Sequence, residues 1–127
     1  NAFNGAVTTA ADYINFLGML LNKGTFEGKT VLSGKSVKEL ETLQFPTLPV
    51  KFVPKEAAGY KTALGCWLSD DGNTVASLNE DGFWPYIDLD HGYAAIIVPK
   101  SGVSEPKPEL YVQLRQHLEA SFGAGGK

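Results

Sequence analysis

Several short stretches place residue types at spacings that could support acyl transfer. Ser104 and Lys107 are three residues apart, which on a helix brings a serine hydroxyl within one turn of a lysine that can take its proton. Here the pair lies in a proline-rich approach to a later apolar segment. We therefore expect Ser104 to cap a helix rather than to act as a nucleophile.

Three other matches to catalytic patterns fail in their local context. Tyr13 and Asn15 have the spacing of a proton-shuttling pair that needs a loop, but they fall within a helical apolar pattern. Lys29–Val31 and Lys61–Ala63 resemble Lys-Thr-Gly in only two positions. Because valine and alanine cannot give the close backbone approach that glycine permits, both are expected to be solvated strand or turn edges.

The two histidines do not indicate a catalytic triad. His91 follows Asp88 and Asp90 in a turn-like stretch, and His117 falls in the last helical pattern. Asp88, Asp90 and His91 could bind a cation adventitiously, but ordinary turn chemistry is the favoured interpretation. No metal signature is recognisable, and we expect no metal or organic cofactor.

Composition limits the classes of partner. The chain has 127 residues, 43% of them hydrophobic, which fits one folded globular domain. Its 11 basic and 14 acidic residues give a net charge of -3, so no cationic field is available for nucleic acid. The single cysteine, Cys66, is expected to pack in the interior. No apolar run is long enough to span a membrane, and the absence of an initiator Met suggests a processed or excised chain.

Helical patterns occur at both ends of the chain. Apolar residues at spacings of three and four predict a helix over Ala10–Leu21, with Thr9 and Asp12 as a capping pair and Gly24 as a stop. A shorter helix is expected after Ser36. The last helix follows Ser104, and its expected buried stripe consists of Leu110, Tyr111, Leu114, Leu118 and Phe122. Residues 123–127 are expected to fray.

The middle of the chain has strand-like patterns. Prolines make the segment from Phe45 to Tyr60 a surface excursion. Short aromatic and β-branched runs then predict an antiparallel meander over Ala63–Leu68, Thr74–Leu78, Phe83–Leu89 and Tyr93–Val98. Because Ala94–Val98 is apolar on both faces, this strand is expected inside a sheet that is covered on each side. The predicted fold is α/β: an antiparallel sheet of three to four strands, two N-terminal helices and a C-terminal helix.

The order of these elements resembles the C-terminal portion of the serine β-lactamase-like hydrolases. The resemblance is closest to the branch of class C β-lactamases, carboxylesterases and penicillin-binding proteins. It rests on Gly5–Tyr13, Phe16–Gly24, Leu64–Trp67 and the final pair Phe83–Asp88 and Gly92–Val98. The resemblance implies that residues 1–127 form one partial domain of a larger three-layer fold. It is compatible with a secreted or periplasmic location, although the sequence identifies no compartment.

The resemblance also implies where an active-site edge would lie. In this family Lys or His, a small residue and Gly line the active site from a strand, and the matching positions are Glu80, Asp81 and Gly82. The backbone N–H of Phe83 would then donate to an oxyanion. Glu80 departs from the family pattern, because a carboxylate repels an anionic substrate instead of pairing with it.

These expectations give two hypotheses from different classes. The first is the C-terminal fragment of a serine acyl-hydrolase for ester or amide bonds, whose nucleophile lies outside this chain. Its partner would be the N-terminal part of the same precursor, or another chain that covers the sheet. The second, supported by Glu80, is a non-catalytic binding or scaffold module with the same fold.

The isolated chain should not hydrolyse a short-chain p-nitrophenyl ester or a chromogenic cephalosporin above background. The reason is that Ser104 and Lys107 have the wrong context for a nucleophile and its base. A spectrophotometric assay of the pure wild-type chain and of Ser104→Ala checks this expectation. Activity that disappears in Ser104→Ala would show that Ser104 is a nucleophile.

Overall fold

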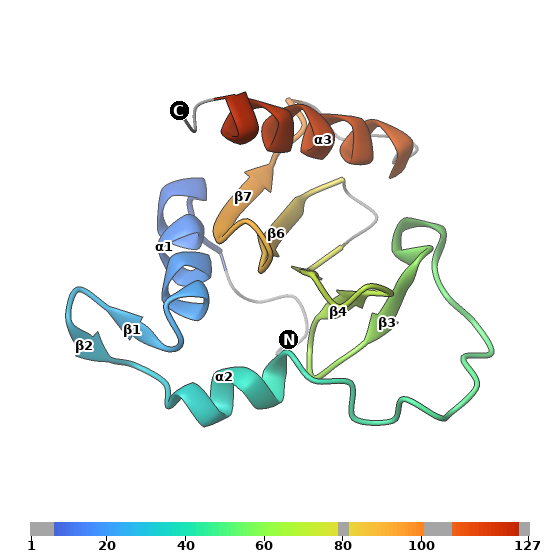
Figure 1. Cartoon of the computed structure of the whole chain (residues 1–127), viewed down its shortest axis with the longest axis horizontal. Coiled ribbons are helices and arrows are strands. Elements are labelled where there is room, and N and C mark those ends of the chain that lie inside the picture. The colour runs from blue at the N-terminus through green and yellow to red at the C-terminus, as the bar shows by residue number, and fades with distance from the viewer. Residues whose placement is uncertain (1–6, 79–81, 101–107, 125–127) are drawn as a thin grey trace.

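The computed structural model describes residues 7–78, 82–100 and 108–124 (Figure 1). These ranges contain three α-helices, a five-stranded antiparallel sheet, a two-stranded hairpin and a short 3₁₀ turn, η1. The helices are α1 (Ala10–Leu21), α2 (Gly34–Leu40) and α3 (Pro108–Ala124), and η1 is Lys55–Ala57. The strands are β1 (Thr25–Phe26), β2 (Lys29–Thr30), β3 (Tyr60–Thr62), β4 (Trp67–Ser69), β5 (Thr74–Ala76), β6 (Trp84–Asp88) and β7 (Tyr93–Ile97).

The main sheet is the predicted antiparallel meander, but it has five strands instead of three to four. Its order is β3-β4-β5-β6-β7, so each strand pairs with its neighbour in the sequence. The predicted strand Ala63–Leu68 is only partly correct, because Trp67 and Leu68 lie in β4 while the residues before them form the turn between β3 and β4. In that turn the Ala63 N–H donates to the Cys66 carbonyl at 2.9 Å. The apolar run conceals this turn because its one turn-forming residue is Gly65, which has φ of 76°.

The inner strand is β6 and not β7. All five residues of β6 are buried, whereas β7 is half-buried throughout and is the last strand in the order of the sheet. The expectation that Ala94–Val98 lies inside the described sheet is therefore wrong. The expected cover on each side is present, because α1 packs against one face of this edge strand and α3 against the other.

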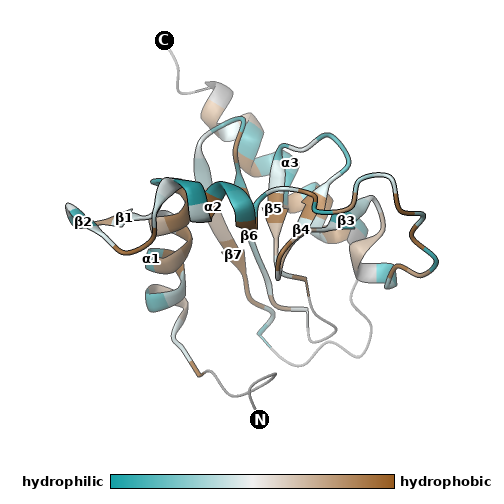
Figure 2. Cartoon of the chain, turned by 90° about the horizontal axis from the view of Figure 1, so that it is seen from below, coloured by the Kyte–Doolittle hydropathy of each residue, from teal (hydrophilic) through white to brown (hydrophobic). Residues whose placement is uncertain are grey.

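The main sheet lies between α1 and α3, and two clusters of side chains hold these three layers together. On one face of the sheet Leu17 of α1 packs with Leu68, Val75 and Ile87. On the other face Ala76, Trp84 and Tyr86 form the second cluster, against which Tyr111 of α3 packs. Residues of β6 thus alternate between the two clusters, with α1 and α3 on opposite sides of the sheet (Figures 1 and 2).

Helix α1 has the predicted bounds and the predicted cap. The Thr9 hydroxyl accepts the Asp12 N–H at 3.1 Å and donates to the Asp12 carboxylate at 2.7 Å. Gly24 follows the helix with φ of 91°, and a Cβ there would come within 2.1 Å of the Leu32 carbonyl oxygen. Only glycine fits this close approach of the two chain segments.

The segments after α1 differ in detail from the expectations. Helix α2 begins at Gly34, since the Ser33 hydroxyl caps it by accepting the Ser36 N–H at 3.0 Å. The start after Ser36 is therefore wrong. The hairpin of β1 and β2 was not predicted, because two-residue strands carry almost no periodic signal.

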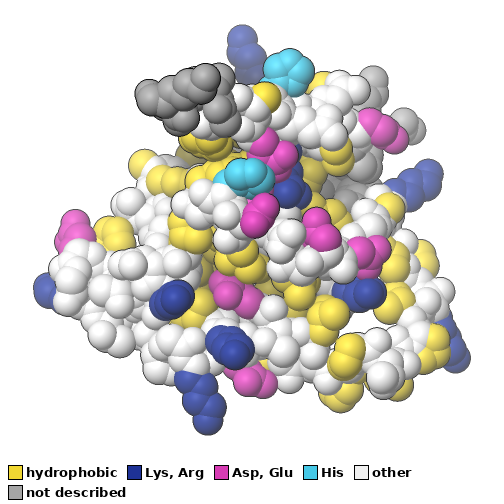
Figure 3. Space-filling view, viewed as in Figure 1, with side chains coloured by type: hydrophobic (Ala, Val, Ile, Leu, Met, Phe, Trp, Pro, Cys, Tyr) yellow, Lys and Arg dark blue, Asp and Glu magenta, His cyan; other side chains and the backbone are white. Residues whose placement is uncertain are grey.

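The proline-containing segment before β3 is a surface excursion, as predicted. Apart from η1 it has no regular structure, and it exposes Phe45, Leu48, Val50 and Phe52 by 56–81%. Hydrophobic side chains accordingly lie on the surface of the molecule in this region (Figure 3).

Helix α3 faces the sheet with only part of the predicted stripe. The Tyr111 and Phe122 rings contact Trp84 and Tyr93, with centroid distances of 4.6 and 4.9 Å. Polar residues fill the space between these contacts, and the apolar residues Leu110, Leu114 and Leu118 are 38–52% exposed. Within the described ranges, neither α3 nor any other helix has the length and apolar character of a membrane span.

One buried ion pair fastens the middle of α3 to the sheet. The Arg115 guanidinium donates to the Asp88 carboxylate at 3.1 Å, and the Asp88 side chain has no exposed surface. Burial acts to raise the pKa of Asp88, but hydrogen bonds from His91 and the Arg115 charge outweigh it and lower the pKa. The ionised form of Asp88 therefore stabilises the folded state.

We expect Asp88→Asn to lower the free energy of unfolding by about 2–3 kcal/mol at neutral pH, because a charged hydrogen bond is lost. Since the pKa of Asp88 is depressed on folding, its contribution is present above the unfolded pKa of about 3.9 and is lost as the pH falls through the folded value. Denaturant unfolding between pH 7 and pH 2 should therefore give a shallower pH dependence for this variant than for Asp90→Asn, its control in the same turn. Parallel curves for the two variants would contradict this role of Asp88.

Candidate functional site

The predicted site residues lie at the entrance to β6. Gly82 and Phe83 directly precede Trp84, and Gly82 is buried whereas Phe83 is half-buried. Glu80 and Asp81 lie outside the described residues. The geometry of this candidate site is therefore that of the Gly82–Phe83 peptide and its neighbours.

Helix α3 holds the Gly82–Phe83 peptide from one side. Tyr111 donates its hydroxyl hydrogen to the Gly82 carbonyl at 2.6 Å. That carbonyl and the Phe83 N–H belong to one peptide plane, and in a trans peptide they point in opposite directions. The Tyr111 hydrogen bond thus orients the Phe83 N–H, a role that the sequence pattern did not reveal because Tyr111 looks like one more apolar stripe residue.

Helix α1 holds the same segment from the other side. The Phe83 ring lies edge-on against the Tyr13 ring, with centroids 5.5 Å apart and planes at 77°. Tyr13 is thus a packing residue within α1, as its place in the apolar pattern of that helix predicts, although it is half-buried. Gly82 has φ of 79°, a conformation that favours glycine.

Within the part of the chain that the structure describes, the other sequence motifs are not assembled into a site. Lys29–Thr30 and Lys61–Thr62 lie in strands β2 and β3, as solvated strand edges, in agreement with their interpretation. Ser104 and Lys107 lie outside the described residues. His117 is exposed on α3, with its Nδ1 3.1 Å from the Gln113 carbonyl oxygen.

Asp88, His91 and Glu119 form the one group in the described ranges whose ligand atoms are close enough to share a metal ion, within 4.8 Å of one another. The Asp88 carboxylate accepts the backbone N–H groups of Asp90 and His91, which is turn chemistry. Arg115 also reaches the carboxylates of Asp88 and Glu119 at 3.1 and 2.6 Å. Because this guanidinium already pairs with both carboxylates, the group fits an ion-pair network better than a metal site.

Cys66 has the packing role expected from the sequence. It lies among half-buried residues, and its thiol donates to the Leu40 carbonyl at 3.3 Å. Burial, aided by the Glu41 charge, raises the pKa of the thiol to about 11. The thiolate needed for nucleophilic chemistry is therefore strongly disfavoured at neutral pH.

Comparison with known proteins gives a similarity among solved structures. No family model matches the chain, and no curated protein matches it. Among solved structures, the chain is similar to the crystal structure of a "putative beta-lactamase" from Bacteroides dorei DSM 17855, with a TM-score of 0.64 and 24% identity. The match covers 86% of this chain and 39% of that one, so the chain spans well under half of that protein's length. In its fold, the chain resembles part of a β-lactamase-like protein.

Proposed function

We propose that this chain is the C-terminal portion of a serine acyl-hydrolase that acts on ester or amide bonds. The observation that carries the proposal is the structural similarity to part of a β-lactamase-like protein over 86% of the chain. In the proposed mechanism a serine from outside this chain attacks the carbonyl carbon. A lysine and a tyrosine from the same outside region move protons, and backbone N–H groups stabilise the oxyanion.

The contribution of this chain would be the edge formed by Glu80, Asp81, Gly82 and Phe83. The Phe83 N–H is the proposed oxyanion donor, and Tyr111 is a positioning residue that acts through the Gly82 carbonyl. Support for this assignment comes from the two contacts, Tyr111 with Gly82 and Tyr13 with Phe83, that fix the segment from α3 and α1. A fixed donor is what oxyanion stabilisation requires.

Glu80 favours neutral substrates. A carboxylate at the position where the family has a cation repels the carboxylate of a β-lactam but has little effect on an uncharged ester. The same residue supports the alternative of a non-catalytic module that keeps the fold. The two proposals differ in whether the complete protein turns over any acyl substrate.

The partner in either case would be the N-terminal part of the same precursor. Within the described sheet β7 has a neighbour on one side only, which leaves backbone groups for a further strand. Leu110, Leu114 and Leu118 of α3 are also 38–52% exposed, an apolar stripe that a covering segment would bury.

The proposal predicts a charge-dependent choice of substrate in the complete protein. Glu80→Lys should raise the ratio of kcat/KM for a chromogenic cephalosporin to that for p-nitrophenyl butyrate by about tenfold, a change equivalent to about 1.4 kcal/mol. Glu39→Lys, which makes the same charge change on the exposed surface of α2, is the matched control. Valine at Gly82 is less informative, because φ of 79° would strain the backbone whatever the function.

If the ratio of kcat/KM for the cephalosporin to that for the ester is the same in Glu80→Lys, Glu39→Lys and the wild type, Glu80 does not lie beside the bound substrate. Absence of turnover of both substrates by the complete wild-type protein would refute the enzyme and leave the non-catalytic module.

A further inference from the structure

An apolar cavity lies between α1, the end of α2 and the sheet. Its volume is about 130 Å³, and its wall includes Phe16, Leu20, Val75 and Ile87. An apolar cavity of about 150 Å³ in another protein stays free of water and binds benzene. This cavity therefore has the size and the lining for one six-membered ring or a short branched chain.

The cavity can be reached from the surface. Phe16 and Leu64 belong to its wall, yet they are 45% and 46% exposed. Their exposed parts form an apolar rim, so a ligand can enter without unfolding of either helix.

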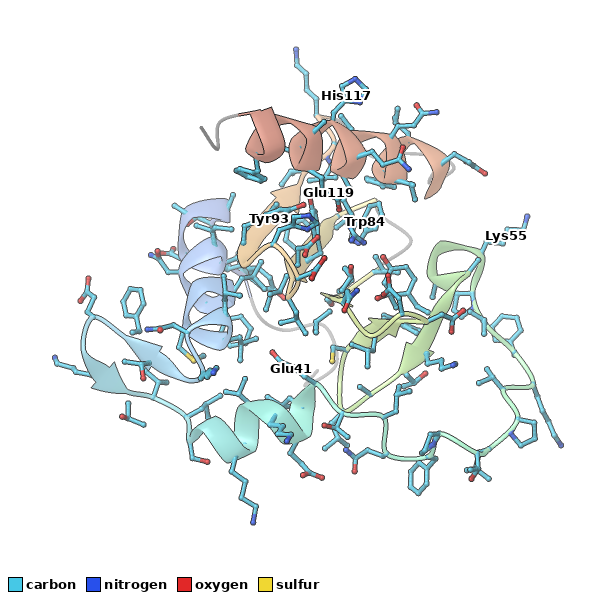
Figure 4. The ribbon with its side chains drawn as sticks, in the orientation of Figure 1. Glu41, Lys55, Trp84, Tyr93, His117 and Glu119 are labelled. Atoms are coloured by element: carbon cyan, nitrogen blue, oxygen red, sulfur yellow. The ribbon has the colours of Figure 1, made fainter. Side chains whose placement is uncertain are left out.

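One charged side chain faces this apolar space. Glu41 lies at the end of α2, and its side chain extends toward the space between α1 and β4 (Figure 4). None of the ion pairs within the described ranges includes Glu41. Burial raises its pKa, which means that its carboxylate lacks the compensation that a cation would supply. The position of Glu41 at the C-terminal end of α2 disfavours its carboxylate further, because the helix dipole is negative there.

We infer that this cavity binds a small amine that carries an apolar ring or a branched alkyl chain. The apolar part would occupy the space beside Leu20 and Val75, and the ammonium group would pair with Glu41 at the mouth. The Tyr13 and Phe16 rings, which also line the cavity, add favourable surfaces for a cation. Binding at this cavity needs no nucleophile, so it is independent of the proposed acyl transfer.

The test compares three ligands of one shape and different charge in the longest natural form of the protein that carries this chain. We expect isothermal titration at neutral pH to show the tightest binding for benzylamine, weaker binding for toluene and the weakest binding for benzoate. Benzylamine should bind at least tenfold more tightly than toluene. Glu41→Gln should remove this difference, whereas Glu39→Gln, on the exposed side of α2, should retain it.

A cavity-filling variant locates the ligand. Leu20→Phe should weaken both benzylamine and toluene at least tenfold, while Leu48→Phe, at a 61% exposed position, should change neither affinity. Three results would overturn the inference: no binding of benzylamine, binding of benzoate as tight as that of benzylamine, or the same preference for benzylamine in Glu41→Gln as in the wild type. The Glu41→Gln comparison decides the matter even if Leu20→Phe fails to fold.

Discussion

The burial of β6 on both faces is the constraint on which the rest of the structure depends. Trp84, Tyr86 and Asp88 face α3, while Pro85 and Ile87 face α1, and all five residues are buried. Such a strand is stable only if both faces stay covered. Hence α1 and α3 must lie on opposite sides of the sheet, although they are at opposite ends of the chain.

The same constraint produces the candidate site. Gly82 and Phe83 enter β6 between the two helices, so each helix can hold one side of the segment. Tyr111 fixes the Gly82 carbonyl, and Tyr13 packs against the Phe83 ring. The buried Asp88–Arg115 pair keeps α3 in place at the other end of β6. The Phe83 N–H, the proposed oxyanion donor, is thus positioned by the same two helices that cover the faces of the sheet.

Sequence patterns predicted the elements with strong periodicity and missed those fixed by tertiary contacts. Helix α1 had both a clear apolar stripe and the Thr9 cap, and its bounds were correct. Local patterns do not encode strand order, so the edge position of β7 was missed. The stripe of α3 was only partly correct, because between Tyr111 and Phe122 it is Arg115 that faces the sheet, where it meets Asp88, a partner distant in the sequence. The family resemblance predicts Gly82 as a site residue, but the hydrogen bond from Tyr111 joins residues 29 positions apart and leaves no local pattern in the sequence.

The central claim is that the outer edge of β7 receives a strand from another part of the same precursor. Hydrogen–deuterium exchange of the β7 amides, followed by mass spectrometry, tests it most directly. The claim predicts rapid exchange of the outward-facing amides of Tyr93–Ile97 in the 127-residue chain and slow exchange in the complete precursor. Equal protection of these amides in both forms would contradict it.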